Sequence, residues 1–542
     1  MSKIAHYLQE HLNGEVTDSL EARRYFSHDA SILQISPSVV VYPASESDVR
    51  KTARFCWQLA ERGKVLPITA RGGGSDTSGA AIGSGIIMVF TAHMNRILAM
   101  DPKKEFVTVE PGITFGSLLQ TLYTHGLFLP PYPTSSAYAT IGGGLANNTI
   151  GEKSVKYGDL AKYVEKLSVV LANGEVIETG PLNKRELNRK LGLTTLEGNI
   201  YRGIDALIEE NQALLAEEKQ RMRATHNRAG YNIFDVKTKK GFDLTPLFLG
   251  SQGSLGIITE ATLQLVRHNP VAELAVLSLG GLSELHDVLP RIIELKPSVC
   301  EMINKAAVMQ INRLSPNQLK GLLDNPAADI HLIIEFDDSK EANQKKALKQ
   351  LAKIAQRSDG SLMIASNTED RDRINKFRRS IATLFLENRG NTKAVPAADD
   401  VAVPVDALFD FMQKAIEIYS QADLMPAMWG HAGDGVVRMN PVLDIGNVGD
   451  RQKLFKVSDA IYKSALSFGG SISGGAGDGR LRAPYLAHVY GPEASRLMLE
   501  IKKVFDPHGI LNRGVKTASA DEIKAIMRNE YSRPHHEHLP RS

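Results

Sequence analysis

The sequence predicts an α+β fold in two main parts, followed by a short C-terminal segment. Up to about residue 270, strand-like and helix-like stretches alternate with frequent glycine turns. Beyond that point, amphipathic helical patterns surround a strand pattern at 329–336, which fits helices packed over a sheet. A chain of 542 residues is longer than one hydrophobic core usually serves, so we expect at least two domains.

The first part opens with a strand and a helix. β-branched residues at 39–41 predict the strand. Ser45 is a candidate N-cap with Asp48 three residues later, and Gly63 suits the position just after the helix.

Further along, the segment 166–180 predicts a β-hairpin in which Asn173 and Gly174 form a type I′ turn. Alternating apolar residues at 254–266 predict the last strand of this region.

The second part has three amphipathic helical patterns, at 282–297, 343–356 and 408–421. The segment 509–516 is rich in turn residues and is expected to cross back after the last long helix. The final residues, 529–542, form a polar tail.

Composition excludes several classes of protein. Lys and Arg total 64 against 61 Asp and Glu, so the net charge of +3 gives no electrostatic footprint for nucleic acid. Cys56 and Cys300 are too few for a disulfide framework or a cysteine-built metal site. The N-terminus has no signal-peptide core, and no apolar run approaches the ~20 residues of a membrane span. We therefore expect a cytoplasmic protein with no membrane span.

Three glycine-rich stretches predict a binding site. The first, "TARGGGSDTSGAAIG" at 69–83, can turn successive backbone N–H groups onto an anion. It lacks the Walker lysine and the G-x-G-x-x-G spacing, and by itself it also suits a surface turn. The second, 130–159, has another triple glycine among Ser, Thr and Asn, and the third is 248–263. Three such loops suit an elongated ligand with phosphates, a ribose and a flat ring.

In this order and spacing, the stretches resemble the p-cresol methylhydroxylase (PCMH)-type FAD-binding domain of the vanillyl-alcohol oxidase superfamily. From "VVVYPASESDV" to "FDPHGILNRGVK" the chain resembles the FAD-linked oxidases that include D-lactate and D-2-hydroxyglutarate dehydrogenases. The resemblance implies a two-subdomain FAD-binding domain at 1–270 and an α+β substrate cap at 271–480. It also implies that a C-terminal segment, 481–542, returns to the FAD domain and ends in the polar tail.

The resemblance also implies which residues contact FAD. The first loop would hold the pyrophosphate, the second the ribityl and isoalloxazine side, and the third loop and the returning segment further parts of the cofactor. The implied contacts are Arg71, Gly72, Gly73, Gly74, Ser75, Asp76, Ser78, Thr140, Gly142, Gly143, Asn148, Gly151, Gly256, Ile257, Ile258 and Asn512. Some members bind flavin covalently through a first-loop histidine, where this chain has Ser75 and Asp76, so we expect non-covalent FAD.

On the substrate side, Arg378 in "KFRRS" lies where a carboxylate-binding arginine is common in the family. A guanidinium fork suits a carboxylate because it donates two parallel hydrogen bonds. Other cations surround Arg378 in the sequence, so a solvated helix face is an equal alternative.

The family's metal-binding motifs are altered in this chain. Metal-using relatives have two histidines in one motif, of which His431 is kept while Arg438 occupies the second position. In the other motif, Gly475 and Ala476 replace a glutamate and a histidine. One candidate ligand of four remains, and a cation at a ligand position repels a divalent ion. We expect no catalytic metal.

The resemblance implies an FAD-dependent dehydrogenase or oxidase that oxidises a small, D-lactate-like 2-hydroxy acid by hydride transfer to flavin N5. His431 is the candidate base, and Arg438 the candidate cation for the carboxylate or the developing alkoxide. His431 as a structural remnant stays an open alternative. So do a flavoenzyme for another alcohol or sugar-derived substrate, and a flavin-binding subunit with a decayed substrate site. The electron acceptor stays open among a quinone, a cytochrome, a flavoprotein and oxygen.

Overall fold

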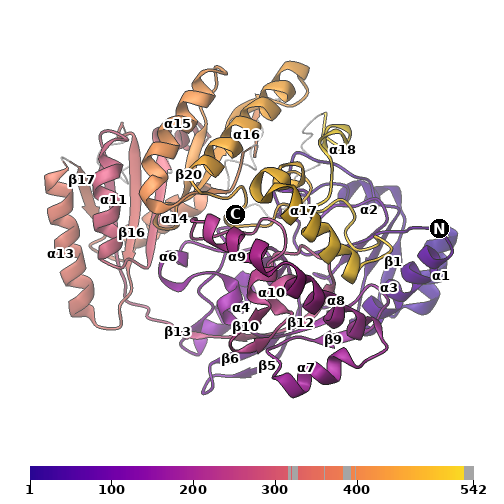
Figure 1. The fold of residues 1–542 in the computed structure, drawn as a ribbon. Helices are drawn as coiled ribbons and strands as arrows, with labels where there is room; N and C mark the ends of the chain where they lie inside the picture. Colours follow the sequence, from indigo (N-terminus) through magenta and orange to yellow (C-terminus); the bar gives the residue numbers. More distant parts are fainter. Residues whose placement is uncertain (315–318, 320–326, 359, 382–391, 397, 530–542) are drawn as a thin grey trace.

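A computed structural model describes the chain except residues 315–318, 320–326, 359, 382–391, 397 and 530–542. Nearly all of the expected polar tail lies outside the described residues. Helices and strands are mixed along the whole chain, which confirms the predicted α+β class (Figure 1). Among the described residues, no helix is long and apolar enough to cross a membrane.

The first of three main sheets is formed near the N-terminus. Its strands, in spatial order, are β1 (Glu15–Thr17), β2 (Val39–Tyr42), β4 (Ile86–Val89) and β3 (Ile68–Arg71). β2, β4 and β3 are parallel and β1 is antiparallel. α1 (Lys3–His11) and α3 (Glu46–Glu61) share an apolar core with this sheet. β3 therefore ends directly at the first glycine-rich loop.

The start of α3 differs in detail from the sequence prediction. Ser45 occupies the N-cap position, but its side chain makes no capping hydrogen bond. Instead, the carboxylate of Asp48 accepts hydrogen bonds from the backbone N–H groups of Asn13, Gly14 and Ala44. The first turn of α3 is thereby tied to the N-terminal segment.

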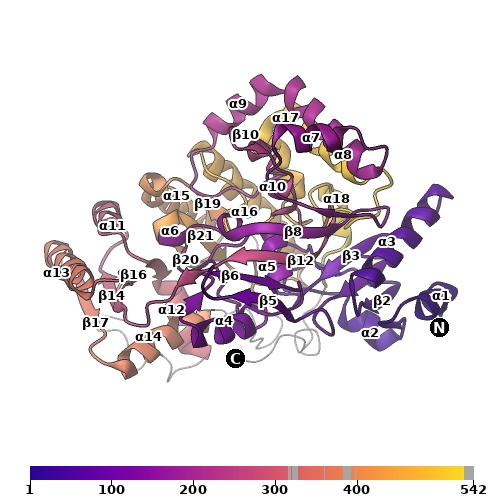
Figure 2. The same ribbon diagram turned by 90° about the horizontal axis from the view of Figure 1, so that it is seen from below.

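The second sheet is antiparallel and contains the predicted hairpin. In spatial order its strands are β5 (Ile97–Asp101), β6 (Phe106–Val109), β12 (Ile257–Gln264), β8 (Val164–Val170) and β9 (Val176–Glu178). Of these, β5, β6, β12 and β8 are visible in Figure 2. The type I′ prediction for the β8–β9 turn is wrong, because Gly174 has a positive φ of +83° and Asn173 does not. Leu171 N–H donates to Glu175 O and Gly174 N–H donates to Leu171 O, which is the pattern of a three-residue loop.

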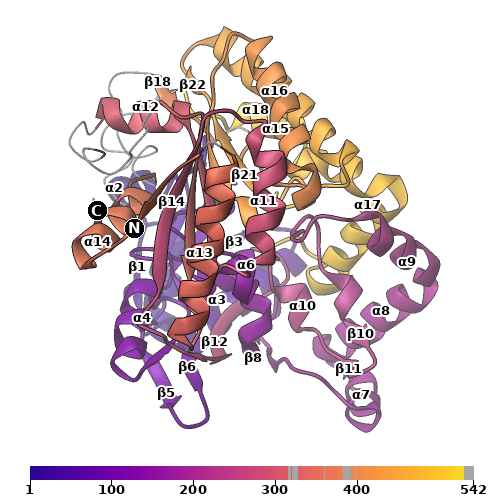
Figure 3. The same cartoon turned by 90° about the vertical axis from the view of Figure 1, so that its left-hand side faces the viewer.

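The third sheet has seven strands and helices on both faces (Figure 3). In the strand Glu273–Leu279, alternate residues point to opposite faces of the sheet. Leu274 and Val276 pack in the core on one face, and Ala275 and Leu277 pack in the core on the other. In spatial order the strands are β17 (Ser361–Ile364), β14 (Glu273–Leu279), β16 (Ile330–Phe336), β15 (Val299–Asn304), β20 (Ala427–His431), β21 (Val436–Asn440) and β19 (Val401–Ala402). α12 (Lys305–Leu314) and α14 (Thr368–Ser380) cover the first face, and α11 (Glu284–Glu294) and α13 (Glu341–Arg357) the second.

The C-terminal part lies against the first part of the chain. α17 (Leu486–Phe505) lies beside α8 (Leu196–Glu210) (Figure 1). Beyond it, Ile510 O accepts a hydrogen bond from Ile68 N–H, and Asn512 N–H donates to Ile68 O. Residues that follow α17 therefore run alongside β3.

The remaining elements are connections and short pairs. Named helices are α2 (Leu20–Tyr25), α4 (Phe115–Thr124), α5 (Ile141–Asn147), α6 (Ser154–Tyr157), α7 (Lys184–Leu191), α9 (Gln212–Arg221), α10 (Thr245–Phe248), α15 (Leu408–Ser420), α16 (Val448–Ser467) and α18 (Ala520–Ala525). The short strand pairs are β7 (Leu127–Phe128) with β13 (Val266–Arg267), β10 (Lys237–Thr238) with β11 (Gly241–Phe242), and β18 (Thr392–Ala394) with β22 (Val442–Asp444).

Candidate functional site

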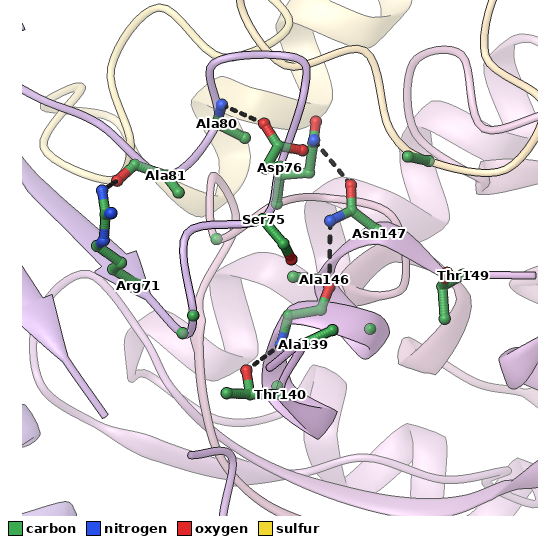
Figure 4. A pocket seen from close by; sticks show the side chains of 18 of the residues that line it. Arg71, Ser75, Asp76, Ala80, Ala81, Ala139, Thr140, Ala146, Asn147 and Thr149 are labelled. Atoms are coloured by element: carbon green, nitrogen blue, oxygen red, sulfur yellow. Dashed lines mark hydrogen bonds between the residues drawn. The ribbon is translucent and has the colours of Figure 1, made fainter. Parts of the chain in front are cut away.

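The three glycine-rich loops line one cavity of about 1200 Å³, part of which is open to solvent (Figure 4). The end of β3, the start of α5 and the start of β12 each contribute to its wall. Of the predicted FAD contacts, the ones that line it are Arg71, Gly72, Gly73, Gly74, Ser75, Asp76, Thr140, Gly142, Gly143, Gly256, Ile257 and Ile258. Arg438, Gly475 and Ala476 line it from the later half of the chain.

The first loop has room for nothing larger than glycine where it meets the second. A Cβ on Gly72 would lie 2.1 Å from Thr140 Oγ1, and one on Gly73 would lie 2.2 Å from the carbonyl oxygen of Tyr138. The backbone N–H groups of residues 73–77 donate no hydrogen bond to any described residue. A loop of unpaired N–H groups at a cavity wall is suited to binding an anion.

Charged side chains of the first loop hold its shape. Buried Arg71 donates a hydrogen bond to Ala81 O at 3.0 Å, and burial lowers its pKa to about 10. Asp76 accepts hydrogen bonds from the backbone N–H groups of Ser78 at 3.0 Å and Ala80 at 2.7 Å, the second of which is shown in Figure 4. The Ser78 hydroxyl also donates a hydrogen bond to Asp76. Ser78 was predicted to contact FAD, but it is buried behind the loop and does not line the cavity.

The second loop is ordered by its own side chains. Thr140 Oγ1 accepts a hydrogen bond from Gly143 N–H at 3.1 Å, and the Asn147 side chain donates to Gly143 O at 3.2 Å (Figure 4). Predicted contacts Asn148 and Gly151 lie outside the cavity wall. The Asn148 amide oxygen accepts a hydrogen bond from the Ala161 N–H at 2.9 Å, so this side chain is engaged away from the cavity.

Gln252 and Asn512 connect the loops to one another. Gln252 lines the cavity, and its side-chain amide donates to Ser78 Oγ at 3.1 Å and to Asn147 Oδ1 at 2.9 Å. Asn512 is buried behind the cavity wall and donates to Ala80 O and Gln252 O. The predicted Asn512 therefore holds the loops together rather than lining the cavity.

Arg438 brings to the cavity wall a cation that lies near two aspartates but is not hydrogen-bonded. It lies on β21 with its guanidinium 5.1 Å from the centre of the Trp429 ring. Its terminal nitrogens are 3.6 Å from Asp399 Oδ2 and 3.4 Å from Asp400 Oδ1, beyond normal hydrogen-bond length. The guanidinium makes no hydrogen bond to any described residue, and its Nε is buried without a partner. With 21 % of its side chain exposed, Arg438 suits an anion that enters the cavity.

Gly475 and Ala476 line the cavity beside Arg438. Their backbone N–H groups donate to the carboxylate of Asp400 at 3.0 and 2.6 Å. A Cβ on Gly475 would lie 2.8 Å from Asp400 Oδ1 and 3.1 Å from a side-chain carbon of Ile150. Asp400 and Ile150 therefore occupy the space that a longer side chain at position 475 would need. Among the described residues, no three His, Cys, Asp or Glu side chains are arranged to hold a metal ion.

His431 and Arg378 lie in a buried charged cluster outside the cavity wall. His431 Nδ1 is 2.8 Å from Glu301 Oε1. Arg378 donates to Glu152 Oε1 at 2.6 Å, and its Nε is 3.8 Å from Glu301 Oε2. Arg378 is buried, so the solvated helix face is wrong for this residue. Burial raises the pKa of Glu152, while the charge of Arg378 acts in the opposite direction.

Several residues of the site were not among the predicted FAD contacts. Asn147 and Gln252 lie inside the glycine-rich stretches, so their position was a usable signal. Asp400 belongs to an acidic pair just before an apolar strand, which is a weaker signal. Glu301 lies within β15 and has no sequence feature that indicates its contact with His431.

Comparisons with known families match two long segments. Residues 37–180 match the family described as FAD binding domain, and residues 268–515 match the family described as FAD linked oxidases, C-terminal domain. The chain therefore matches an FAD-binding domain followed by the C-terminal domain of FAD-linked oxidases. This result confirms the predicted resemblance, while the predicted domain boundaries stay a prediction.

Relatives of known name have sequences that align over most of the chain. The D-2-hydroxyglutarate dehydrogenase of Escherichia coli (strain K12) is 29 % identical over 93 % of this chain and 50 % of that protein. Glycolate oxidase subunit GlcD of Bacillus subtilis (strain 168) is 27 % identical over 94 % and 95 % of the two chains. D-lactate dehydrogenase of Anaerostipes hadrus is 26 % identical over 91 % and 93 %. The chain spans about half the length of the D-2-hydroxyglutarate dehydrogenases it matches.

Solved structures show the same fold at low sequence identity. The 4-ethylphenol oxidase from Gulosibacter chungangensis has a TM-score of 0.69 at 14 % identity and covers 96 % of this chain and 98 % of its own. p-Cresol methylhydroxylase has a TM-score of 0.68 at 16 % identity, with coverage of 96 % and 97 %. The predicted PCMH-type fold is confirmed.

Proposed function

We propose that this chain binds FAD non-covalently in the cavity and oxidises a small, D-lactate-like 2-hydroxy acid to the 2-oxo acid. The observation that carries the proposal is Arg438, a cavity-lining guanidinium with no hydrogen bond to any described residue. A carboxylate satisfies such a group with charge-assisted hydrogen bonds. The names of the aligned relatives, all of which act on 2-hydroxy acids where the name states a substrate, support this substrate class.

The cavity fits FAD. The free N–H groups of residues 73–77 suit the pyrophosphate, and the close approach of the first and second loops leaves their backbones facing the cavity. The residues that would hold the cofactor are the predicted contacts that line the wall, together with Asn147 and Gln252. Residues 72–77 contain no histidine, cysteine or tyrosine to bond the flavin covalently. Bound FAD supplies a hydride acceptor.

His431 is the proposed acceptor of the substrate's hydroxyl proton. Oxidation removes a hydride from the substrate carbon and a proton from its hydroxyl oxygen, so a base is needed. Arg438 pairs with Trp429 across β20 and β21, and His431 is two residues from Trp429 on the same strand. His431 and Arg438 therefore lie diagonally on one face of the strand pair, at a spacing of roughly 7–8 Å. His431 does not itself line the cavity, so its proposed role rests on this diagonal relation to Arg438.

We reassign Arg378 from substrate binding to the support of this site. Glu152 and Glu301 already balance its charge, and it does not line the cavity. The electrons leave to an external acceptor, for which a quinone, a cytochrome, a flavoprotein and oxygen are the candidates.

The test is anaerobic reduction of the purified holoprotein. The visible spectrum shows whether flavin is bound, and acid precipitation should release it into the supernatant. We then expect a D-2-hydroxy acid, and not its L-isomer, to bleach the flavin absorbance. Bleaching only by other alcohols or sugar derivatives would indicate a different substrate. Flavin that no compound in the panel reduces would indicate a decayed substrate site, and a colourless protein that rejects added FAD would overturn the cofactor as well.

A further inference from the structure

Arg438 lies beside two aspartates and forms a hydrogen bond with neither. Its terminal nitrogens are 3.6 Å from Asp399 Oδ2 and 3.4 Å from Asp400 Oδ1. A direct hydrogen bond between a guanidinium and a carboxylate is shorter, at about 2.7–2.9 Å. In each aspartate, the carboxylate instead accepts a hydrogen bond from another part of the cavity wall.

The carboxylate of Asp400 is held by the backbone of residues 475 and 476. Gly475 N–H is 3.0 Å from both Oδ1 and Oδ2, and Ala476 N–H donates to Oδ2 at 2.6 Å. Both oxygens of this carboxylate therefore have donors other than Arg438.

The carboxylate of Asp399 is held by the first loop. The hydroxyl of Thr77 donates to Asp399 Oδ2 at 3.1 Å, across 322 residues of sequence. Asp399 Oδ1 is buried without a hydrogen-bond partner, and the whole residue is 2 % exposed. Among the residues that the structure describes, the Thr77 hydroxyl is thus the only hydrogen-bond donor to this carboxylate.

Asp399 and Arg438 each have a buried polar atom with no partner, and these atoms belong to neighbouring side chains of opposite charge. The atoms are Asp399 Oδ1 and Arg438 Nε. Buried polar groups left unpaired are unfavourable, and a guanidinium and a carboxylate pair strongly. Without the hydrogen bond from Thr77, we therefore expect the carboxylate to turn and pair directly with Arg438. The guanidinium would then be occupied when another carboxylate enters the cavity.

We infer that Thr77 is a positioning residue for substrate binding: its hydroxyl holds Asp399 back from a direct pair with Arg438, so that the guanidinium stays available to the substrate carboxylate. This role rests on the proposed function, in which Arg438 binds the substrate. Thr77 lines the cavity as part of the first loop. The same hydrogen bond therefore connects the loop proposed for the FAD pyrophosphate with the cation proposed for the substrate.

The variants Thr77→Val and Thr77→Ser test this role in the FAD-loaded protein. Valine keeps the shape of threonine without the hydroxyl, and serine keeps the hydroxyl. Binding is measured with pyruvate, a 2-oxo acid with no hydride to give, through the fluorescence of Trp429, whose ring centre is 5.1 Å from the guanidinium. Trp57→Phe removes the other tryptophan of the chain. We expect the Kd of pyruvate to rise about tenfold in Thr77→Val and to stay within about 3-fold of wild type in Thr77→Ser.

Two further measurements separate this role from damage to the loop. Rapid mixing with D-lactate without oxygen gives the limiting rate of flavin reduction, and fluorescence titration of the apoprotein gives the Kd for FAD. In Thr77→Val we expect both to stay within about 3-fold of wild type, because only substrate binding is affected. Thr108→Val is the matched control: its hydroxyl contacts Thr262 on the second sheet, outside the cavity wall, and its variant should match wild type throughout.

Asp399→Asn should have the opposite effect to Thr77→Val. A neutral amide cannot form the charged pair with Arg438, so the Kd of pyruvate should equal the wild-type value or fall below it. In the Asp399→Asn background, Thr77→Val should change that Kd less than about 3-fold, because Thr77 acts through the Asp399 carboxylate.

Three results would overturn the inference alone: a wild-type Kd of pyruvate in Thr77→Val, a raised Kd in Asp399→Asn, or a loss of FAD binding in Thr77→Val as large as its loss of pyruvate binding. The second would show that Asp399 supports Arg438, and the third that Thr77 maintains the cofactor loop. A wild-type holoprotein that neither binds pyruvate nor is reduced by any 2-hydroxy acid would overturn the proposed function, and this role of Thr77 with it.

Discussion

Asn512 donates a hydrogen bond from its side-chain amide to the backbone oxygen of Gln252 at 2.6 Å, across 260 residues of sequence. The same amide donates to Ala80 O at 2.8 Å, and Asn512 Oδ1 accepts from Thr69 Oγ1 at 3.1 Å and Arg480 Nη2 at 3.2 Å. One buried side chain thereby joins the first loop, the third loop and the C-terminal segment behind the proposed FAD site.

Replacing Asn512 by alanine should weaken FAD binding and the fold together. The change leaves two buried carbonyl groups without their donor, which costs about 1–3 kcal/mol of unfolding free energy. We expect a lower melting temperature and a Kd for FAD raised about tenfold, the change that 1.4 kcal/mol produces. Flavin fluorescence titration and thermal unfolding measure the two effects. Asn95→Ala, in an exposed turn, is the control, and a wild-type Kd for FAD in Asn512→Ala would contradict this role.

The sequence was sufficient for the loops because each is marked by consecutive glycines. The contacts that require Gly72 and Gly73, with the Thr140 side chain and the Tyr138 carbonyl oxygen, come from the second loop, but the glycines themselves are visible in the sequence. The hairpin at Gly174 was also found, but its loop type was not, because an Asn-Gly pair fits both a two-residue turn and the end of a three-residue loop.

The supporting contacts were not predictable in the same way. Gln252 reaches Asn147, and Arg378 reaches Glu152, across 105 and 226 residues. Such contacts depend on how the sheets meet, which a single sequence does not specify. For the same reason, the sequence around Arg378 fitted a carboxylate-binding arginine and a solvated helix face equally well. The structure decides against the solvated helix face, because Arg378 is buried between two glutamates.

Gly475→Ala should weaken substrate binding more than FAD binding. The added Cβ would lie 2.8 Å from Asp400 Oδ1, so the carboxylate must move, and Asp400 is 3.4 Å from Arg438. We expect an apparent Kd for the 2-hydroxy acid raised about 3- to 10-fold, with FAD content unchanged. Gly281→Ala, where a Cβ meets only ordinary contacts, is the control. Equal losses of FAD and substrate binding would show that the whole wall had shifted.

Asp29 should make stability depend on pH. It is buried beneath the first loop and accepts a hydrogen bond from Ala81 N–H at 3.2 Å. Burial, assisted by the charge of Asp76, raises its pKa to about 6. The ordinary pKa is about 3.9, so between these values the folded state holds more protons than the unfolded state. The free energy of unfolding therefore falls as pH rises through this window, by up to about 3 kcal/mol from this group.

Asp29→Asn removes that contribution. The variant should match the wild type near pH 4 and become the more stable of the two by pH 7, in denaturant unfolding at a series of pH values. Asp521→Asn, at an exposed helix start, should show no such divergence. A constant difference between Asp29→Asn and wild type across the range would contradict the raised pKa.

Metal removal should leave the reaction unchanged. Arg438 places a cation at a family ligand position, and a second cation beside it would be repelled. We expect dialysis against a chelator to keep the rate of flavin reduction within about 2-fold, and metal analysis of the holoprotein to show less than one equivalent of any divalent transition metal. A stoichiometric metal whose removal abolishes reduction would contradict the role given to Arg438.

Arg438→Met should separate substrate binding from cofactor binding. The change keeps an apolar side chain over Trp429 but removes the free guanidinium donors. Hydrogen bonds to charged groups contribute about 1.5–3 kcal/mol, so we expect the apparent Kd of the 2-hydroxy acid to rise roughly 10- to 150-fold while FAD content stays the same. Arg438→Lys keeps the charge but loses the fork and should fall between the two. Arg62→Met, at an exposed position, controls for loss of a surface arginine. A fall in the limiting rate with an unchanged Kd would assign Arg438 to the developing alkoxide instead of the carboxylate.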